Sequence, residues 1–206
     1  MRNYVPLIVS GVAMLAGSAS GAVVLFSVTG ADLINSGYGT STQTLNGDDS
    51  VRMEAPNSAF GRTYSLPAME FDPATTYAEV DIQVNAPHTA NNVYLALHDF
   101  DPGVAPDPDT TDVFFYSINL SAAGPSGFTT VVISDLTTPS FNQMDGDVLT
   151  NYDDGGLTQI RIAGSYASGQ VTDITVREIR IMSTVPEPSV LMSGLLAFLP
   201  VLVRRR

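Results

Sequence analysis

The chain has 206 residues and a formal net charge of -12, with 21 acidic residues against 9 basic residues, all of which are Arg. This acidic balance argues against a polybasic nucleic-acid-binding protein. A hydrophobic content of 44% is enough for a packed core, while the absence of Cys and Lys excludes disulfides, thiolate metal sites, Schiff-base chemistry and a phosphate-binding loop with its lysine.

The N-terminus has the three parts of a secretory signal peptide. Arg2 supplies the positive charge, an apolar run covers Val5 to Ala16, and the small residues Gly17 to Ala22 follow. We expect residues 1–22 to be this signal, with cleavage after Ala22. The protein is therefore predicted to be exported.

Residues 23–184 have the pattern of a single all-β domain. Short runs rich in Val, Ile, Thr and aromatic residues recur between Gly, Pro, Asn and Asp clusters, without helical periodicity. This pattern predicts a jelly-roll-type β-sandwich of about eight strands. The expected strands are Val23 to Val28, Gly61 to Leu66, Tyr77 to Val84, Val93 to His98, Val113 to Leu120, Thr129 to Ile133, Leu157 to Ala163 and Ile174 to Met182.

Two-residue alternation assigns a core side to these strands. In the run from Phe114 to Tyr116, the phase buries Phe114 and Tyr116 and exposes Phe115. The last strand changes phase between Val176 and Ile179, which predicts a β-bulge at Arg177 and Glu178.

The end of the domain is similar to the end of carbohydrate-binding-module-like sandwiches. The similarity is a pattern of strands and turns over about residues 77–182, with Gly156 to Gly164 and Asp173 to Ile181 as its last two strands. It implies that these two strands lie in opposite sheets.

Glycan recognition commonly combines aromatic faces with nearby polar groups. Outward-facing residues of these types occur on several strands, and they would line one surface if the strands were neighbours in one sheet. The candidates are Tyr77, Glu79, Asp81, Tyr94, Phe115 and Arg161.

A small glycoside-active enzyme that uses Glu79 and Asp81 is the alternative. The run from Glu79 to Gln83 resembles the Glu-x-Asp-x-Glu strand motif of laminarinase-like jelly-roll glycosidases, whose outer glutamates are nucleophile and acid/base. Gln83 replaces the second glutamate. An amide cannot act as an acid or a base, so the pair of catalytic carboxyls is incomplete.

An acidic, proline-containing loop lies between two predicted strands. Its carboxylates match the oxygen ligands that Ca²⁺ requires, although the spacing fails the EF-hand template. A solvated acidic hairpin loop is the alternative interpretation. The predicted ligands are Asp99, Asp101, Asp107, Asp109 and Asp112, and Ca²⁺ is the only cofactor that the sequence indicates.

The C-terminus carries the most specific motif. Pro186, Glu187 and Pro188 precede an apolar run from Val190 to Val203, and three arginines, Arg204, Arg205 and Arg206, end the chain. Terminal positive charge is retained on the cytoplasmic side of a membrane, so the run is predicted to be a short transmembrane helix that tethers the domain. Residues 185–206 resemble the PEP-CTERM sorting signal, which implies processing by an exosortase-type membrane protease and association with exopolysaccharide or the cell envelope.

Together these features predict an exported bacterial envelope or extracellular-matrix protein. We expect membrane tethering by the C-terminal helix, followed by placement on the cell surface or in the matrix. The polar residues do not converge into a nucleophile or acid/base set, which favours a non-catalytic binding or structural module over an enzyme.

Overall fold

The computed structural model describes residues 21–34, 37–69, 72–86, 88–89, 92–100, 111–143, 156–164 and 168–184. The predicted signal peptide, apart from Gly21 and Ala22, and the predicted sorting signal lie outside these residues. Among the described residues, no helix has the length and apolar character that crossing a bilayer requires.

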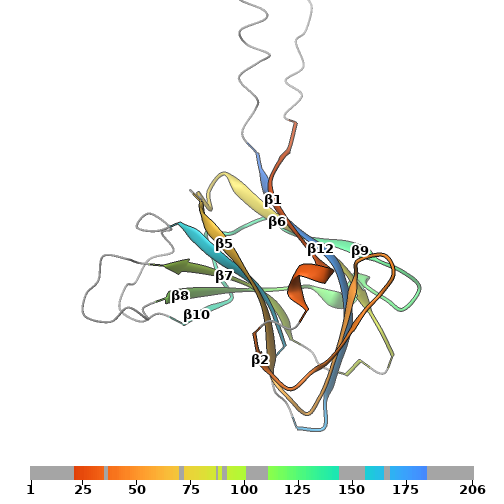
Figure 1. Cartoon of the computed structure of the whole chain (residues 1–206). Coiled ribbons are helices and arrows are strands. Elements are labelled where there is room, and N and C mark those ends of the chain that lie inside the picture. Colours follow the sequence, from red (N-terminus) through yellow and green to blue (C-terminus); the bar gives the residue numbers. More distant parts are fainter. Residues whose placement is uncertain are drawn as a thin grey trace, which may run out of the picture. The chain divides into compact units, whose positions relative to one another are not determined.

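Two antiparallel sheets of six strands each form a β-sandwich, shown in Figure 1 with β12 and β6 in one layer and β5, β7 and β8 in the other. We refer to these layers as sheet A and sheet B. The order in sheet A is β3 (Thr42–Leu45), β4 (Val51–Pro56), β12 (Val171–Ser183), β6 (Thr76–Val84) and β9 (Thr129–Ile133), and β1 (Val23–Thr29) also pairs with β12. The order in sheet B is β10 (Phe141–Gln143), β8 (Thr111–Ser117), β7 (Val93–Phe100), β11 (Leu157–Gly164), β5 (Phe60–Met69) and β2 (Tyr38–Gly39).

The all-β sandwich is confirmed, and each of the eight predicted strands has a counterpart. The described residues contain four further strands, β2, β3, β4 and β10, which the sequence analysis missed. They have two to six residues. Two short 3₁₀ helices, Gly30–Leu33 and Leu120–Ala122, complete the regular structure of the described residues. The last two strands, β11 and β12, lie in opposite sheets, as the resemblance to carbohydrate-binding modules implied.

The core lies between the sheets and follows the predicted alternation. Ala78, Val80 and Ile82 of β6 are fully buried, and so are Val93 and the other inward residues of β7. Phe114 and Tyr116 of β8 are buried as predicted, and the hydroxyl of Tyr116 donates a hydrogen bond of 2.7 Å to the carbonyl of Leu136. The polar atom of this large core residue is therefore satisfied.

Strand β12 is the strand with the most partners in sheet A. One edge pairs with β6 over nearly its whole length, while β4 and β1 share the other edge. In Figure 1, β1 runs beside the last part of β12. The β12–β6 register shifts between Val176 and Glu178, which confirms the predicted bulge.

A buried carboxylate on β12 joins β4 and the end of β6. The side chain of Asp173 is 0% exposed and accepts hydrogen bonds from the Arg52 Nε at 2.9 Å and from the Asn85 amide at 2.9 Å. The same amide of Asn85 donates to the hydroxyl of Thr175. Burial raises the pKa of Asp173, but the hydrogen bonds from Arg52 and Asn85 and the charge of Arg52 outweigh burial and lower this pKa.

We predict that Arg52→Gln destabilises the protein more than Asp173→Asn. Removing Arg52 leaves a fully buried carboxylate without its counter-charge, which costs about 3 kcal/mol of unfolding free energy. Removing the charge of Asp173 leaves a guanidinium that is 42% exposed and can be solvated, so the loss is about 1–2 kcal/mol. Urea denaturation of the two variants measures the difference, and equal losses would contradict this account of the pair.

Candidate functional site

The structure divides the predicted glycan-binding residues between two faces. Tyr77, Glu79 and Asp81 lie on β6 in sheet A, whereas Tyr94, Phe115 and Arg161 lie on β7, β8 and β11 in sheet B. Outward side chains of the two sheets of a sandwich point in opposite directions. The six residues therefore cannot line one surface, because the condition of a shared sheet is met only by the second group.

The outer face of sheet A is occupied by ion pairs. Asp81 accepts hydrogen bonds from the hydroxyl of Thr130 at 2.6 Å and from the Nη2 of Arg177 at 2.6 Å. Glu79 lies 2.9 Å from the guanidinium of Arg180. Asp81 faces outward as predicted, but it is only 5% exposed because Thr130 and Arg177 cover it.

These contacts bear directly on acid/base chemistry. Burial raises the pKa of Asp81, but the hydrogen bonds from Thr130 and Arg177, together with the positive charges of Arg177 and Arg180, lower it overall. A carboxylate held in its ionised form is a poor proton donor near neutral pH. Both carboxylates of the predicted catalytic alternative are thus engaged within the sheet.

The outer face of sheet B carries a cluster of three aromatic rings. Phe115 on β8 and Phe141 on β10 are stacked, with ring centroids 4.3 Å apart and an interplanar angle of 9°. Tyr94 on β7 meets both rings edge-on, at 5.0 Å from Phe141 and 6.1 Å from Phe115. Offset and edge-to-face arrangements of this kind stabilise aromatic clusters. We call Tyr94, Phe115 and Phe141 the aromatic cluster.

Phe115 faces outward as predicted, yet its predicted exposure is wrong. It is only 4% exposed because Phe141 and Tyr94 cover it, while Phe141 itself remains 42% exposed. Sequence reasoning missed Phe141 because a strand of three residues is too short to show alternation. The ring that a ligand can reach is thus one that the sequence analysis did not name.

Arg161 and Tyr38 lie on the same face, toward the β2 edge. The guanidinium carbon of Arg161 lies 5.1 Å from the centre of the Tyr38 ring, and its Nε donates a hydrogen bond of 3.0 Å to the hydroxyl of Thr63. Gly61 makes this arrangement possible, since a Cβ there would lie 2.5 Å from the Tyr38 ring and 2.8 Å from the Arg161 side chain.

The strand register connects the two groups. Phe141, Phe115, Ala96 and Arg161 are successive partners across β10, β8, β7 and β11. In the neighbouring row, the successive partners across β7, β11, β5 and β2 are Tyr94, Ala163, Gly61 and Tyr38. Ala96 thus lies between the aromatic cluster and Arg161 in the first row, and Ala163 and Gly61 lie between Tyr94 and Tyr38 in the second.

His98 lies on this face, next to Val113 and Gln159 in the register, and is only 3% exposed. Its Nε2 has no hydrogen-bond partner among the described residues. Burial, and secondarily the positive charge of Arg161, lowers the pKa of His98 to about 3. This histidine is therefore neutral at physiological pH and adds no charge to the face.

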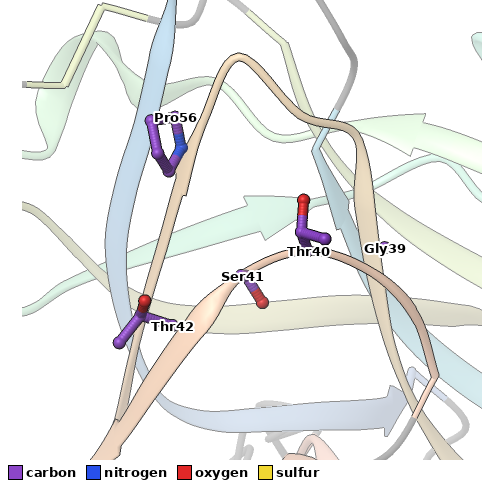
Figure 2. Close-up of a pocket in the computed structure, with 5 residues that line it drawn as sticks. All are labelled: Gly39, Thr40, Ser41, Thr42 and Pro56. Atoms are coloured by element: carbon purple, nitrogen blue, oxygen red, sulfur yellow. The ribbon is translucent and has the colours of Figure 1, made fainter.

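A pocket of about 370 Å³ lies where the chain passes from β2 in sheet B to β3 in sheet A. Figure 2 shows Thr40 and Ser41 on the connecting segment, with Pro56 on the adjacent β4. Gly39 and Thr42 complete the lining. The hydroxyl of Thr40 donates to Ser58, and that of Ser41 accepts from Arg62 at 2.6 Å. No aromatic ring lines this pocket, so it offers no stacking surface for a sugar.

Only two of the five predicted calcium ligands lie within the described residues. Asp99 and Asp112 are direct partners at the loop end of the β7–β8 hairpin, while Asp101, Asp107 and Asp109 lie outside the described residues. Within the described ranges, no group of three or more His, Asp or Glu residues is placed to hold a metal ion. Calcium binding by this loop stays a prediction.

Comparison with known proteins finds no matching family model and no matching curated protein. Solved structures with a similar fold include the family 11 carbohydrate-binding module of the cellulosomal cellulase Lic26A-Cel5E of Clostridium thermocellum, with 17% identity, a TM-score of 0.49 and coverage of 81% of this chain and 96% of that chain. The family 30 module of the cellulase Cel9D-Cel44B from the same organism has 12% identity and a TM-score of 0.48, covering 77% and 98%. The xylan-binding module CBM15 has 14% identity and a TM-score of 0.43, covering 79% and 97%. Similarity at this level does not assign the chain to a family.

We predict that His98 makes the protein less stable as the pH falls below 6.5. The unfolded chain takes up a proton at this residue near its ordinary pKa of 6.5, whereas in the folded protein the pKa of His98 is about 3. The unfolded state then binds more protons, so the free energy of unfolding falls by up to about 1.4 kcal/mol per pH unit in this window.

Urea denaturation at pH 7.0, 6.0 and 5.5 measures this slope. The non-titrating variant His98→Gln should lose most of it over this range, which lies above the pKa values of ordinary carboxyl groups. An identical pH dependence of the two proteins would show that His98 is not the group responsible.

Proposed function

We propose that this chain is an exported, non-catalytic carbohydrate-binding protein, and that its jelly-roll-type sandwich binds glycan on the outer face of sheet B. The observation that carries this proposal is the aromatic cluster on that face, in register with Arg161. Two of the predicted candidates, Tyr94 and Phe115, belong to the cluster, and the structure adds Phe141 to them.

The chemistry of the face suits a sugar. A sugar ring presents C–H groups that pack on an aromatic face, while its hydroxyls need hydrogen-bonding partners at the rim. Phe141 is 42% exposed and Tyr38 is 47% exposed, so both rings are accessible. Thr63 and Arg161 place polar groups between them.

A catalytic role for Glu79 and Asp81 receives less support. A glycosidase needs one carboxyl that gives up a proton and a second that acts as nucleophile or base. Here Asp81 is held as a carboxylate by Thr130 and Arg177, and Glu79 is paired with Arg180. Gln83 stands where the second glutamate of the resembling motif would be. We therefore assign sheet A a structural role.

Export and sorting are part of the proposal and rest on the sequence. Residues 1–22 direct export, and residues 185–206 tether the protein and present it to an exosortase-type protease, after which it associates with exopolysaccharide at the cell surface or in the matrix.

Fractionation of cells that express the full chain tests the proposed export and sorting. We expect the protein in the membrane and extracellular fractions, and replacement of Arg204, Arg205 and Arg206 by Ala should change that distribution. Recovery in the cytoplasm would contradict the export proposal.

Binding to a glycan array tests the proposed function, with CaCl₂ in one arm and EDTA in the other. For any glycan that binds, Phe141→Ala should weaken affinity about ten-fold, or roughly 1.4 kcal/mol, because it removes the accessible ring of the aromatic cluster. Dependence of binding on CaCl₂ would support the calcium expectation for the loop after β7.

Tyr77→Ala is the matched control, since Tyr77 is an outward-facing aromatic residue on sheet A. It should leave the affinity unchanged. The proposed function is contradicted if no glycan binds in either arm, and the proposed face is contradicted if Tyr77→Ala weakens binding as much as Phe141→Ala does.

A further inference from the structure

We infer that the glycan bound by the outer face of sheet B is acidic, and that Arg161 binds its carboxylate or sulfate group beside the sugar that packs on the aromatic cluster. This inference rests on the proposed function and adds to it the chemical class of the ligand. It is argued from the charges of the domain and from the contacts that hold Arg161 in place.

Arginine is scarce in this protein, and its use differs between the two faces. Between residues 23 and 184 there are five arginines and 20 acidic residues. On sheet A, Arg52, Arg177 and Arg180 each form an ion pair with Asp or Glu. Arg62, on β5 of sheet B, is buried and donates hydrogen bonds to Ser41 and to the backbone carbonyls of Tyr38 and Gly39. Arg161, on sheet B, forms no ion pair with any Asp or Glu among the described residues. Although the domain is so acidic, no carboxylate in the described part of the chain is paired with this cation.

The contacts of Arg161 orient its guanidinium without neutralising it. The hydroxyl of Thr63 accepts a hydrogen bond from the Nε, and the guanidinium lies over the ring of Tyr38. A guanidinium has five N–H donors in a fixed fork that matches the two oxygens of a carboxylate. These two neutral partners take up only part of that capacity, so donors remain for an anionic group.

The surroundings of Arg161 strengthen such a contact. The side chain is partly buried, and burial lowers the pKa of Arg161 even though Tyr38 raises it. A partly buried charge is screened less by salt than an exposed one, and desolvating it without a partner is unfavourable. A ligand anion at this position would compensate that burial, and no Asp or Glu among the described residues is paired with Arg161 to do so.

The spacing on the sheet sets a minimum length for the ligand. Phe115 and Arg161 are both partners of Ala96, on opposite sides of β7. They are therefore two strand spacings apart, about 10 Å. A ligand that contacts the aromatic cluster and Arg161 together must extend beyond one sugar ring, so we expect an oligosaccharide or polysaccharide with an acidic unit next to the stacked one.

The test uses the full chain and a glycan array in which acidic glycans are matched by neutral forms. Uronic acid carboxyls are reduced to hydroxymethyl groups, and sulfate esters are removed, with the backbone unchanged. We expect the acidic forms to bind at least ten-fold more tightly than the matched neutral forms. The two treatments also distinguish a carboxylate ligand from a sulfate ligand.

Two variants connect this preference to Arg161. Arg161→Gln should abolish the preference and reduce binding of acidic glycans to that of the neutral forms. Arg161→Lys, which keeps the positive charge but not the fork, should retain part of it. Melting temperatures of both variants identify any loss that is due to unfolding, and residual binding of the neutral glycans provides a second check that the face is intact.

The outcomes separate this inference from the proposed function. If glycans bind but the neutral forms bind as well as the acidic forms, or if Arg161→Gln keeps the preference, the inference is wrong and the proposed function stands. If no glycan of either class binds, the proposed function fails and the inference fails with it.

Discussion

Strand β12 organises sheet A, because β6 pairs with one of its edges and β4 and β1 share the other. Its outward side chains, Asp173, Arg177 and Arg180, form ion pairs with residues of the neighbouring strands β4 and β6. Each of these charges is therefore used to hold strands together. A surface whose charged groups are paired in this way has little capacity left for a ligand, which is why the proposed glycan site is on the other sheet.

Sheet B shows the opposite chemistry on its outer face. On this face its central strands β7 and β11 carry the small, buried residues Ala96 and Ala163, with aromatic rings on one side and Arg161 with Tyr38 on the other. Apolar rings that are partly exposed and a cation held by neutral partners contribute less to folding than buried groups do, and both can gain from a ligand. One chain thus has one face that stabilises the sandwich and another whose chemistry is suited to recognition.

Much of the fold could be predicted from the sequence, because alternation shows directly which side of a strand faces the core. All eight predicted strands and the bulge near Arg177 were found in this way. The short edge strands were not, since β2 and β10 have too few residues to alternate, and with them Tyr38 and Phe141 were missed. The order of strands within a sheet depends on contacts that are distant in sequence. For that reason the sequence could group Tyr77 and Tyr94 on one surface only on the condition of a shared sheet, and they lie in different sheets.

The central claim is that ligand binds on sheet B and that sheet A is structural. The most direct measurement is a titration of ¹⁵N-labelled protein with a bound glycan, followed by the chemical shifts of the backbone amides. The account predicts that the largest changes occur on β7, β8, β10 and β11, around the aromatic cluster and Arg161, with little change on β4, β6 and β12. Changes concentrated instead around Glu79 and Asp81 on β6 would contradict it.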